Sequence, residues 1–96
     1  MSRRDGVLRS YRAAFLRFLA RHEESALHAG YEIGRSALQA GLGLLELVRV
    51  HHDVLIEVLA GTPAEEGPAV AAAASDFFLE VLSSYEMVQR GLRRDG

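Results

Sequence analysis

Apolar side chains recur every three or four residues along almost the whole chain, which is the spacing of one face of an α-helix. No segment alternates apolar and polar residues for long, and β-branched residues are scarce. Glycines near position 40 and the turn-forming segment "GTPAEEGP" (61–68) interrupt the pattern. The sequence therefore predicts an all-α chain with four helices, over residues 5–22, 24–38, 44–59 and 68–93.

The first two predicted helices differ in the size of the side chains along their apolar stripes. The first stripe is mostly large: Val7, Leu8, Tyr11, Ala14, Phe15, Phe18, Leu19 and His22. The second is mostly small: Ala26, Gly30, Ile33, Gly34 and Ala37, flanked by Leu27 and Leu38. A glycine inside a helix costs about 1 kcal/mol relative to alanine. We therefore expect another helix to cross the second one closely enough to offset that cost.

The third and fourth predicted helices have local end signals. Gly41 suits the left-handed position after a helix, and Gly43 suits an N-cap, with Glu46 completing half of a capping box. Pro68 suits the first turn of the fourth helix. The third apolar stripe is predicted to be Leu44, Leu47, Val48, His51, Leu55, Val58 and Leu59. The fourth is predicted to be Val70, Ala74, Phe77, Val81, Tyr85, Val88 and Leu92.

Four amphipathic helices with short connections are typical of a four-helix bundle. Residues 1–96 are expected to form a single domain, because a chain of this length holds one modest core. A coiled coil would need sustained heptads, and the glycine breaks argue against them.

The net charge of −2 hides an uneven distribution along the chain. Residues 1–21 carry six arginines and one acid, residues 22–89 two arginines and eleven acids, and residues 90–96 three arginines and one acid. One interpretation is that the first helix binds nucleic acid. The other is that a basic helix packs beside acidic ones. We favour the second, because the arginines lack interleaved exposed aromatic residues and the rest of the chain would repel phosphate.

The segment "VRVHHD" (48–53) invites a metal or catalytic interpretation. Two adjacent histidines on a helix project about 100° apart, whereas ligand pairs are spaced i, i+3 or i, i+4. We therefore expect His51 to be a half-buried residue whose ring bonds a carbonyl or carboxylate. Phosphate-binding glycine loops and nucleophile motifs are also missing from the sequence. We predict no enzyme activity in these residues, no cofactor or metal, and no small-molecule substrate.

The sequence also bears on the compartment. It has no cysteine, so neither disulfides nor thiolate metal sites can form. The first residues do not resemble a secretion signal, because arginines interrupt their apolar pattern. No uncharged run approaches the roughly 20 residues needed to span a bilayer. A cytoplasmic location without membrane insertion is the expectation.

A few apolar side chains lie off the predicted stripes. They are Leu16, Tyr31, Val50, Leu79 and Met87. One exposed leucine is ordinary, but several on neighbouring helices form a patch of the kind that contacts other chains. A partner or dimer surface is therefore a reasonable hypothesis for some of them.

The segments "ESALHAGYEIGRSALQAGLGLLELVRVHHDVL" (24–55) and "DFFLEVLSSYEMVQRGLR" (76–93) resemble the N-terminal domain of RsbU-type phosphoserine phosphatases. The family pattern has an acidic residue, a leucine and an aromatic-x-x-small-Arg run, then a His-containing helix, and finally an "F-L-x-E-x-L…Y-E-M" helix. The matching positions are Glu24, Leu27, Tyr31, Gly34, Arg35, His51, Phe78, Leu79, Glu80, Leu82, Tyr85, Glu86 and Met87. The family commonly has Ser or Pro where Gly43 stands here, which affects only the cap.

The resemblance implies an all-α domain that forms an antiparallel homodimer, similar to the C-terminal domain of the clock protein KaiA. In the family this domain precedes a metal-dependent PPM-type serine phosphatase domain. An RsbT-like switch kinase binds it and activates the phosphatase in a bacterial partner-switching pathway that controls a stress sigma factor. Since the metal-binding aspartates of a PPM domain are missing here, the chain is expected to be either part of such a protein or a stand-alone regulatory module.

The helical spacing suggests where that partner would bind. Glu24 and His28 lie one turn apart on the outward face of the second helix, and Leu79 and Ser83 one turn apart on that of the fourth. If the two helices are neighbours, these four residues form one shallow partner-binding surface.

Two alternatives stay open. The chain could be a structural homodimerisation module without a switch partner, or an arginine-rich helical protein that binds nucleic acid.

Overall fold

The computed structural model describes residues 3–95, with side chains up to Gly91. Its helices are α1 (Arg3–Arg21), α2 (Glu24–Gln39), α3 (Leu44–Ala60) and α4 (Gly67–Asp95), with a short 3₁₀ helix, η1 (Ala64–Glu66), before α4. Every α-helix begins and ends within two residues of the bounds expected from the sequence. Within the described range there are four α-helices and no strand, so the prediction of an all-α fold is confirmed.

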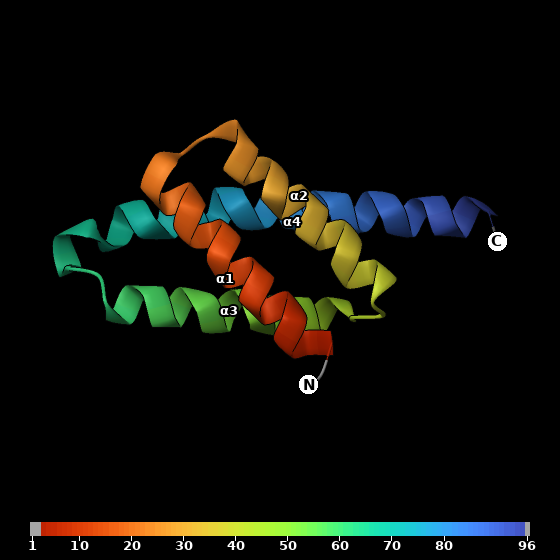
Figure 1. The fold of residues 1–96 in the computed structure, drawn as a ribbon, viewed down its shortest axis with the longest axis horizontal. Coiled ribbons are helices and arrows are strands. Elements are labelled where there is room, and N and C mark those ends of the chain that lie inside the picture. The colour runs from red at the N-terminus through yellow and green to blue at the C-terminus, as the bar shows by residue number, and fades with distance from the viewer. Residues whose placement is uncertain (1–2, 96) are drawn as a thin grey trace.

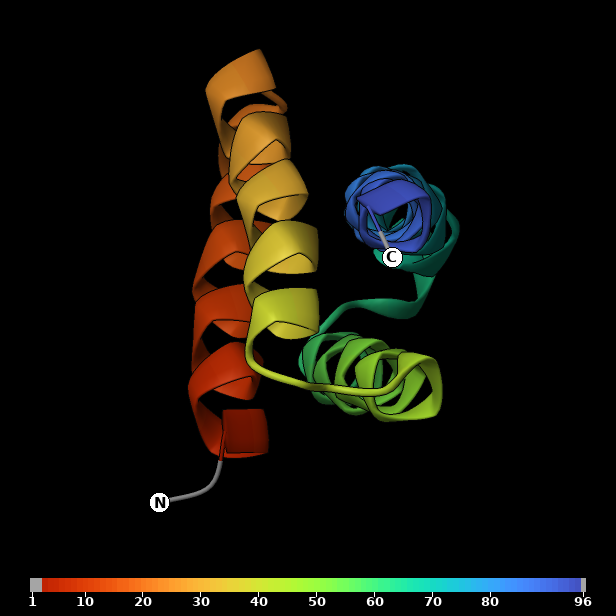
Figure 2. The same cartoon turned by 90° about the vertical axis from the view of Figure 1, so that its right-hand side faces the viewer.

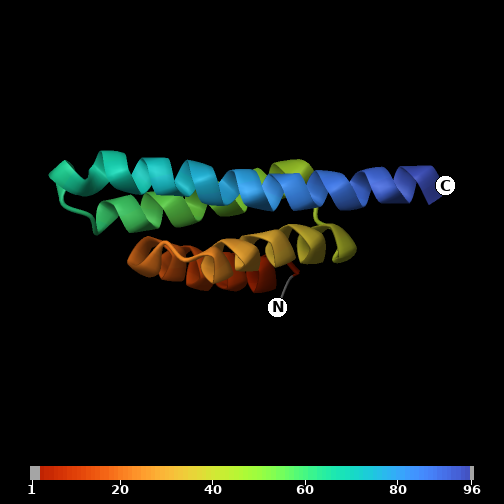
Figure 3. The same cartoon turned by 90° about the horizontal axis from the view of Figure 1, so that it is seen from above.

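The helices form two layers of two (Figure 1). The α1–α2 hairpin crosses obliquely over the layer made by α3 and α4, and the views in Figures 2 and 3 separate the layers. The most extensive contact between helices joins α2 to α4. Toward its C-terminal end, α4 continues past the ends of the other three helices (Figures 1 and 3).

The connection between α2 and α3 has a defined conformation. Gly41 has a φ of 81°, in the left-handed region where glycine is favoured. The Gly43 amide donates to Glu46 Oε2 at 3.1 Å, which is half of a capping box because glycine has no side chain to complete it. From outside the connection, the Tyr85 hydroxyl donates to the Leu42 carbonyl at 2.9 Å, and Arg3 donates to the Ala40 carbonyl. Residues distant in sequence therefore hold the start of α3 in place.

The crossing of α2 and α4 depends on the small residues of α2. The whole central stripe predicted for α2 is buried: Ala26, Gly30, Ile33, Gly34 and Ala37. A β-carbon at Gly34 would overlap both Ser84 Oγ and the Val81 carbonyl oxygen of α4. Ser84 is fully buried, and its hydroxyl donates to that same carbonyl at 3.0 Å. The two backbones thus approach as closely as the sequence led us to expect.

An aromatic cluster lies at the centre of the core. Phe77 of α4 contacts Tyr11, Phe15 and Phe18 of α1, with ring centroids 5.2–5.9 Å apart. From α3 the core receives the buried side chains of Leu47, Val50 and Val54. Aromatic rings carry much of the apolar area that a small core can bury, so this cluster ties α1 to the α3–α4 layer.

The apolar stripe predicted for α3 is correct for Leu47, which is buried, and for the half-buried His51, Leu55 and Val58, but it is wrong for its other three residues. Leu44, Val48 and Leu59, predicted to be buried, are exposed, whereas Val50 and Val54 are fully buried. The helix is apolar on two sides, and the side with the larger residues is not the one that meets the core. His22, placed at the end of the first stripe, is exposed beyond the end of α1.

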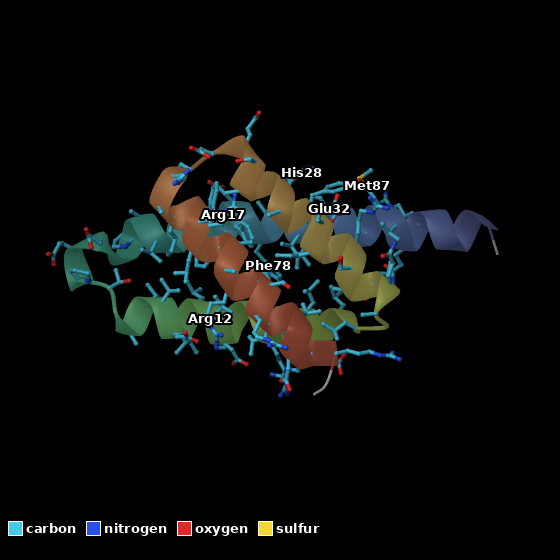
Figure 4. The ribbon with its side chains drawn as sticks, viewed as in Figure 1. Arg12, Arg17, His28, Glu32, Phe78 and Met87 are labelled. Atoms are coloured by element: carbon cyan, nitrogen blue, oxygen red, sulfur yellow. The ribbon has the colours of Figure 1, made fainter. Side chains whose placement is uncertain are left out.

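Arginines of α1 pair with acids of α3. Arg4 lies 3.1 Å from Asp53, and Arg12 lies 2.9 Å from Glu57. Figure 4 shows Arg12 on the side of α1 that faces α3. For these residues the uneven charge of the sequence corresponds to packing of a basic helix beside an acidic one.

No helix in the described part of the chain has the length and hydrophobicity needed to cross a membrane.

Candidate partner-binding surface

The two residues predicted on α2 lie at the edge where α2 runs beside α4. Glu24 and His28 are exposed and line a shallow hollow together with Ser25, Leu27 and Glu80. The His28 ring stacks on Tyr31, and its Nε2 lies 3.6 Å from Glu32 Oε1, one turn further along α2. His28 therefore has neighbours within its own helix and offers a polar edge rather than an apolar anchor.

The two residues predicted on α4 are linked to each other. The Ser83 hydroxyl donates to the Leu79 carbonyl at 2.7 Å, so Ser83 uses its hydrogen on its own helix. Leu79 is 59% exposed. Met87, two turns after Leu79, is equally exposed. These side chains give α4 an apolar outer stripe.

The four predicted residues fall into two pairs rather than lining a single hollow. The α4 residue that lines the hollow with Glu24 and His28 is Glu80, the immediate neighbour of Leu79. In Figure 4, His28 of α2 and Met87 of α4 lie along the same upper edge of the molecule. The helices are neighbours, as the hypothesis required, and Met87 and Glu80 extend the surface beyond the four residues chosen from the sequence.

His51 lies where α3 meets α1 and α4. Its Nδ1 is 2.6 Å from the Tyr11 hydroxyl, and its ring stacks on Phe78 with centroids 3.9 Å apart. The prediction that the ring bonds a carbonyl or carboxylate is therefore wrong, because the partner is a hydroxyl from a residue forty positions earlier. Sequence spacing gave no signal for that pairing. The half-buried ring lies between the three helices.

Two pKa values at this junction are shifted by their surroundings. Burial raises the pKa of Tyr11, so its hydroxyl stays protonated and can donate to His51 Nδ1. Burial, with a smaller effect from the neighbouring charge of His52, lowers the pKa of His51. With Tyr11 as the donor to Nδ1, neutral His51 carries its proton on Nε2. This arrangement favours the neutral ring.

A second hollow lies between α1 and α2, with Gly6, Ser10, Ala13, Ala29 and Ser36 among its small lining residues. Arg17 and Glu32, both labelled in Figure 4, also line it. Apart from these two charged residues and Arg3, the lining has no titratable group. Among the described residues there is also no cluster of three or more His, Cys, Asp or Glu suited to hold a metal ion.

The outer side of α3 is the largest exposed apolar feature that the helical pattern did not predict. Leu44, Leu45, Val48, Ile56 and Leu59 are all exposed, and Leu45 is 79% exposed. The sequence predicts Leu44, Val48 and Leu59 to be in the core stripe, and it makes no prediction for Leu45 and Ile56. Their helical spacing could have indicated this side, since a helix with a second apolar stripe commonly packs against a second neighbour.

The chain matches a family model described as "Phosphoserine phosphatase RsbU, N-terminal domain" over residues 9–88. The match covers parts of all four helices, including both helices of the α2–α4 edge. Comparison with curated proteins and with solved structures gives no significant match.

Proposed function

Since the chain belongs to the family of RsbU N-terminal domains, which are the regulatory and not the catalytic part of RsbU-like phosphatases, we propose that it regulates a PPM-type serine phosphatase. In this proposal an RsbT-like switch kinase binds the domain and activates the phosphatase within a partner-switching pathway that controls a stress sigma factor. The domain works as a homodimer. Its role is to bind proteins.

The observation that carries this proposal is the exposed apolar stripe of α4 beside the polar edge of α2. Leu79 supplies an exposed apolar side chain next to Ser83, and Glu24 and His28 supply polar groups on the neighbouring edge of α2. Met87 extends the apolar stripe by two turns. Protein interfaces commonly combine a few apolar anchors with a polar rim, and this surface has that composition.

The position of the surface on α4 suggests how binding is transmitted. α4 has 29 residues, so it is about 44 Å long at 1.5 Å per residue. Leu79 lies between Phe77 and Val81, which Gly30 and Gly34 of α2 approach. The last turns of α4 extend past the other helices (Figure 3). A partner that contacts both α2 and α4 would bias their packing. The same rigid helix would carry that change to its C-terminal end.

A titration tests the partner surface. An RsbT-like switch kinase is titrated calorimetrically into the domain, into the Leu79→Asp variant and into the Leu16→Asp variant. Leu16 is the matched control, since it is a similarly exposed leucine on α1. We expect Leu79→Asp to weaken binding at least about thirtyfold, as for an interface residue worth about 2 kcal/mol, and Leu16→Asp to leave it unchanged.

Circular dichroism of each variant provides the folding control, because an exposed leucine contributes little to the core. If Leu79→Asp binds the kinase as tightly as the unchanged domain, this surface is wrong. If the domain is a dimer that binds no such kinase, the structural dimerisation alternative replaces the proposal. A mobility shift with duplex DNA at low salt, abolished at high salt, would support the nucleic-acid alternative.

A further inference from the structure

The outer side of α3 carries an apolar stripe that the other helices leave exposed among the described residues. We call it the α3 outer face and define it by Leu45, Val48, His52, Ile56 and Leu59. Leu45 is 79% exposed, Ile56 53%, Val48 39% and Leu59 36%. His52, at the middle of this face, is exposed as well. At 100° per residue, all five positions fall within about 40° of His52 around the helix axis.

The spacing of the α3 outer face is symmetric about its middle. Val48 and Ile56 lie four residues before and after His52, and Leu45 and Leu59 lie seven residues before and after it. A second copy of α3 laid antiparallel on the first would therefore place Leu45 against Leu59, Val48 against Ile56, and His52 against His52. An interface with a two-fold axis requires this relation, in which residue i meets j and j meets i.

We propose that the α3 outer face binds the α3 outer face of a second copy of this chain, antiparallel, with the two-fold axis passing between the two His52 side chains. The inference deepens the homodimerisation part of the proposed function and rests on it. It assigns dimerisation to α3 and leaves the α2–α4 edge free for the switch kinase.

The charges beside the stripe agree with this arrangement. Arg49 flanks the α3 outer face and makes no ion pair with any described residue. In the antiparallel arrangement it lies on the same flank as Asp53 of the second copy and within about one turn of it along the axis. Asp53, which already pairs with Arg4, is 53% exposed and can accept a second donor. The opposite flank begins with the half-buried Leu55, so it adds apolar contact.

The apolar area is large enough to matter. The four aliphatic side chains of the α3 outer face expose on the order of 350 Å², within the range of the largest patches on whole monomers. This chain is a small domain, so such a patch is a large share of its surface. The symmetric spacing favours a second copy over an unrelated partner, which would not need residues equidistant from a central position.

The first test measures mass in solution. We expect sedimentation equilibrium of the unchanged chain to give a species of twice 10.5 kDa. Leu45→Asp should raise the dissociation constant of the dimer at least about a hundredfold, because the substitution occurs twice in a two-fold interface. Leu16→Asp and Leu79→Asp, which place the same change on α1 and α4, should leave the dimer intact. Helix content by circular dichroism verifies that each variant folds.

The second test uses the lack of cysteine in the chain. A His52→Cys variant places each introduced thiol opposite its own counterpart, so mild oxidation should give a covalent dimer in high yield. Leu45→Cys faces position 59 of the second copy and should crosslink poorly alone, but efficiently in the double variant Leu45→Cys/Leu59→Cys. Ala13→Cys, at an exposed site on α1, is the control for random collisions.

The outcomes are distinguishable. A dimer that survives Leu45→Asp and does not crosslink through His52→Cys overturns the α3 assignment while the proposed dimeric state stands. A monomer at high concentration overturns both the α3 assignment and the dimerisation part of the proposed function. Kinase binding is measured separately through Leu79, so a loss of that binding alone leaves the α3 assignment untouched.

Discussion

Helices α2 and α3 have similar lengths but bury their apolar residues to different extents. α2 presents small residues to α4 and has no large apolar side chain that is fully exposed. α3 buries three residues in the core, Leu47, Val50 and Val54, and exposes five large apolar ones on its outer side. The helix with the weaker apolar side chains is thus the one that is packed more completely within the chain.

The difference shows that an apolar stripe and a buried face are separate properties. On α2 they coincide, because the small apolar residues lie along one stripe and that stripe meets α4. On α3 there are two apolar sides, and the core of the chain covers one of them. The uncovered side is the one that we assign to a second copy. Three further tests of this contrast address first the tight crossing and then the attachment of α3.

Replacing Gly34 with alanine should have the largest effect on folding. The added β-carbon would overlap Ser84 Oγ and the Val81 carbonyl, and a backbone atom cannot move aside without shifting α4. We expect a loss of about 3 kcal/mol in the free energy of unfolding, at the upper end for overpacking and despite the better helix propensity of alanine. Urea unfolding followed by circular dichroism measures it.

Gly91→Ala is the matched control for this change. Gly91 also lies inside a helix, but nothing is within 4 Å of the position its β-carbon would take. There the substitution should be neutral or stabilise by up to about 1 kcal/mol. If the two variants unfold at the same urea concentration, the close approach of α2 and α4 does not exclude a side chain at position 34.

The contrast also explains how far the fold could be predicted. Helix ends depend on local chemistry, such as Gly41 and the Gly43–Glu46 pair, so they were accessible from the sequence. The buried stripe of α2 could be predicted because its small residues all lie on one face of the helix. The buried face of α3 was not, because Val50 and Val48 are equally apolar and only the tertiary arrangement decides between them.

The candidate site was less accessible than the fold. Helical spacing placed Glu24 with His28 and Leu79 with Ser83, but it could not determine how the two helices rotate against each other. The hollow at that edge consequently contains Glu80 where Leu79 was expected. The bond from Tyr11 to His51 joins residues in different helices, and no local pattern encodes it. Whether the four residues bind a partner stays a prediction.

We expect pH to have a smaller effect on the free energy of unfolding. It acts through His51, at the junction that attaches α3 to α1 and α4. The unfolded chain binds a proton at His51 near the ordinary histidine pKa of about 6.5, whereas burial keeps the folded ring neutral to lower pH. The contribution of His51 to the free energy of unfolding should therefore be fully present above that value. It should be lost as the pH falls through the pKa of folded His51. Urea unfolding at about pH 7.5 and about pH 5 measures the decline.

His51→Gln isolates the contribution of this ring to the pH dependence. Glutamine keeps an acceptor for the Tyr11 hydroxyl but does not titrate, so the decline with falling pH should become shallower. His22→Gln removes an exposed histidine outside the junction and should leave the decline as it is. An unchanged pH dependence in His51→Gln would mean that the neutral ring is not needed to hold α3 in place.

The smallest effect should come from the ion pair between α1 and α3. Arg12 donates to Glu57 through both Nε and Nη2, at 3.2 and 2.9 Å, and both side chains are partly exposed. Solvent screens such pairs, so a double-mutant cycle with Arg12→Ala and Glu57→Ala should give a coupling of about 0.5 kcal/mol. It should shrink further in high salt.

The Arg35–Glu32 pair, within α2 and 3.8 Å apart, provides the comparison for that cycle. If α3 is held mainly by Leu47, Val50 and Val54, the coupling between Arg12 and Glu57 should be as small as the coupling within α2. A coupling of about 2 kcal/mol or more would contradict this, since it exceeds what exposed pairs contribute. The charged edge of α3 would then attach the helix as firmly as its buried face, and the contrast with α2 would lie in the kind of contact rather than in its strength.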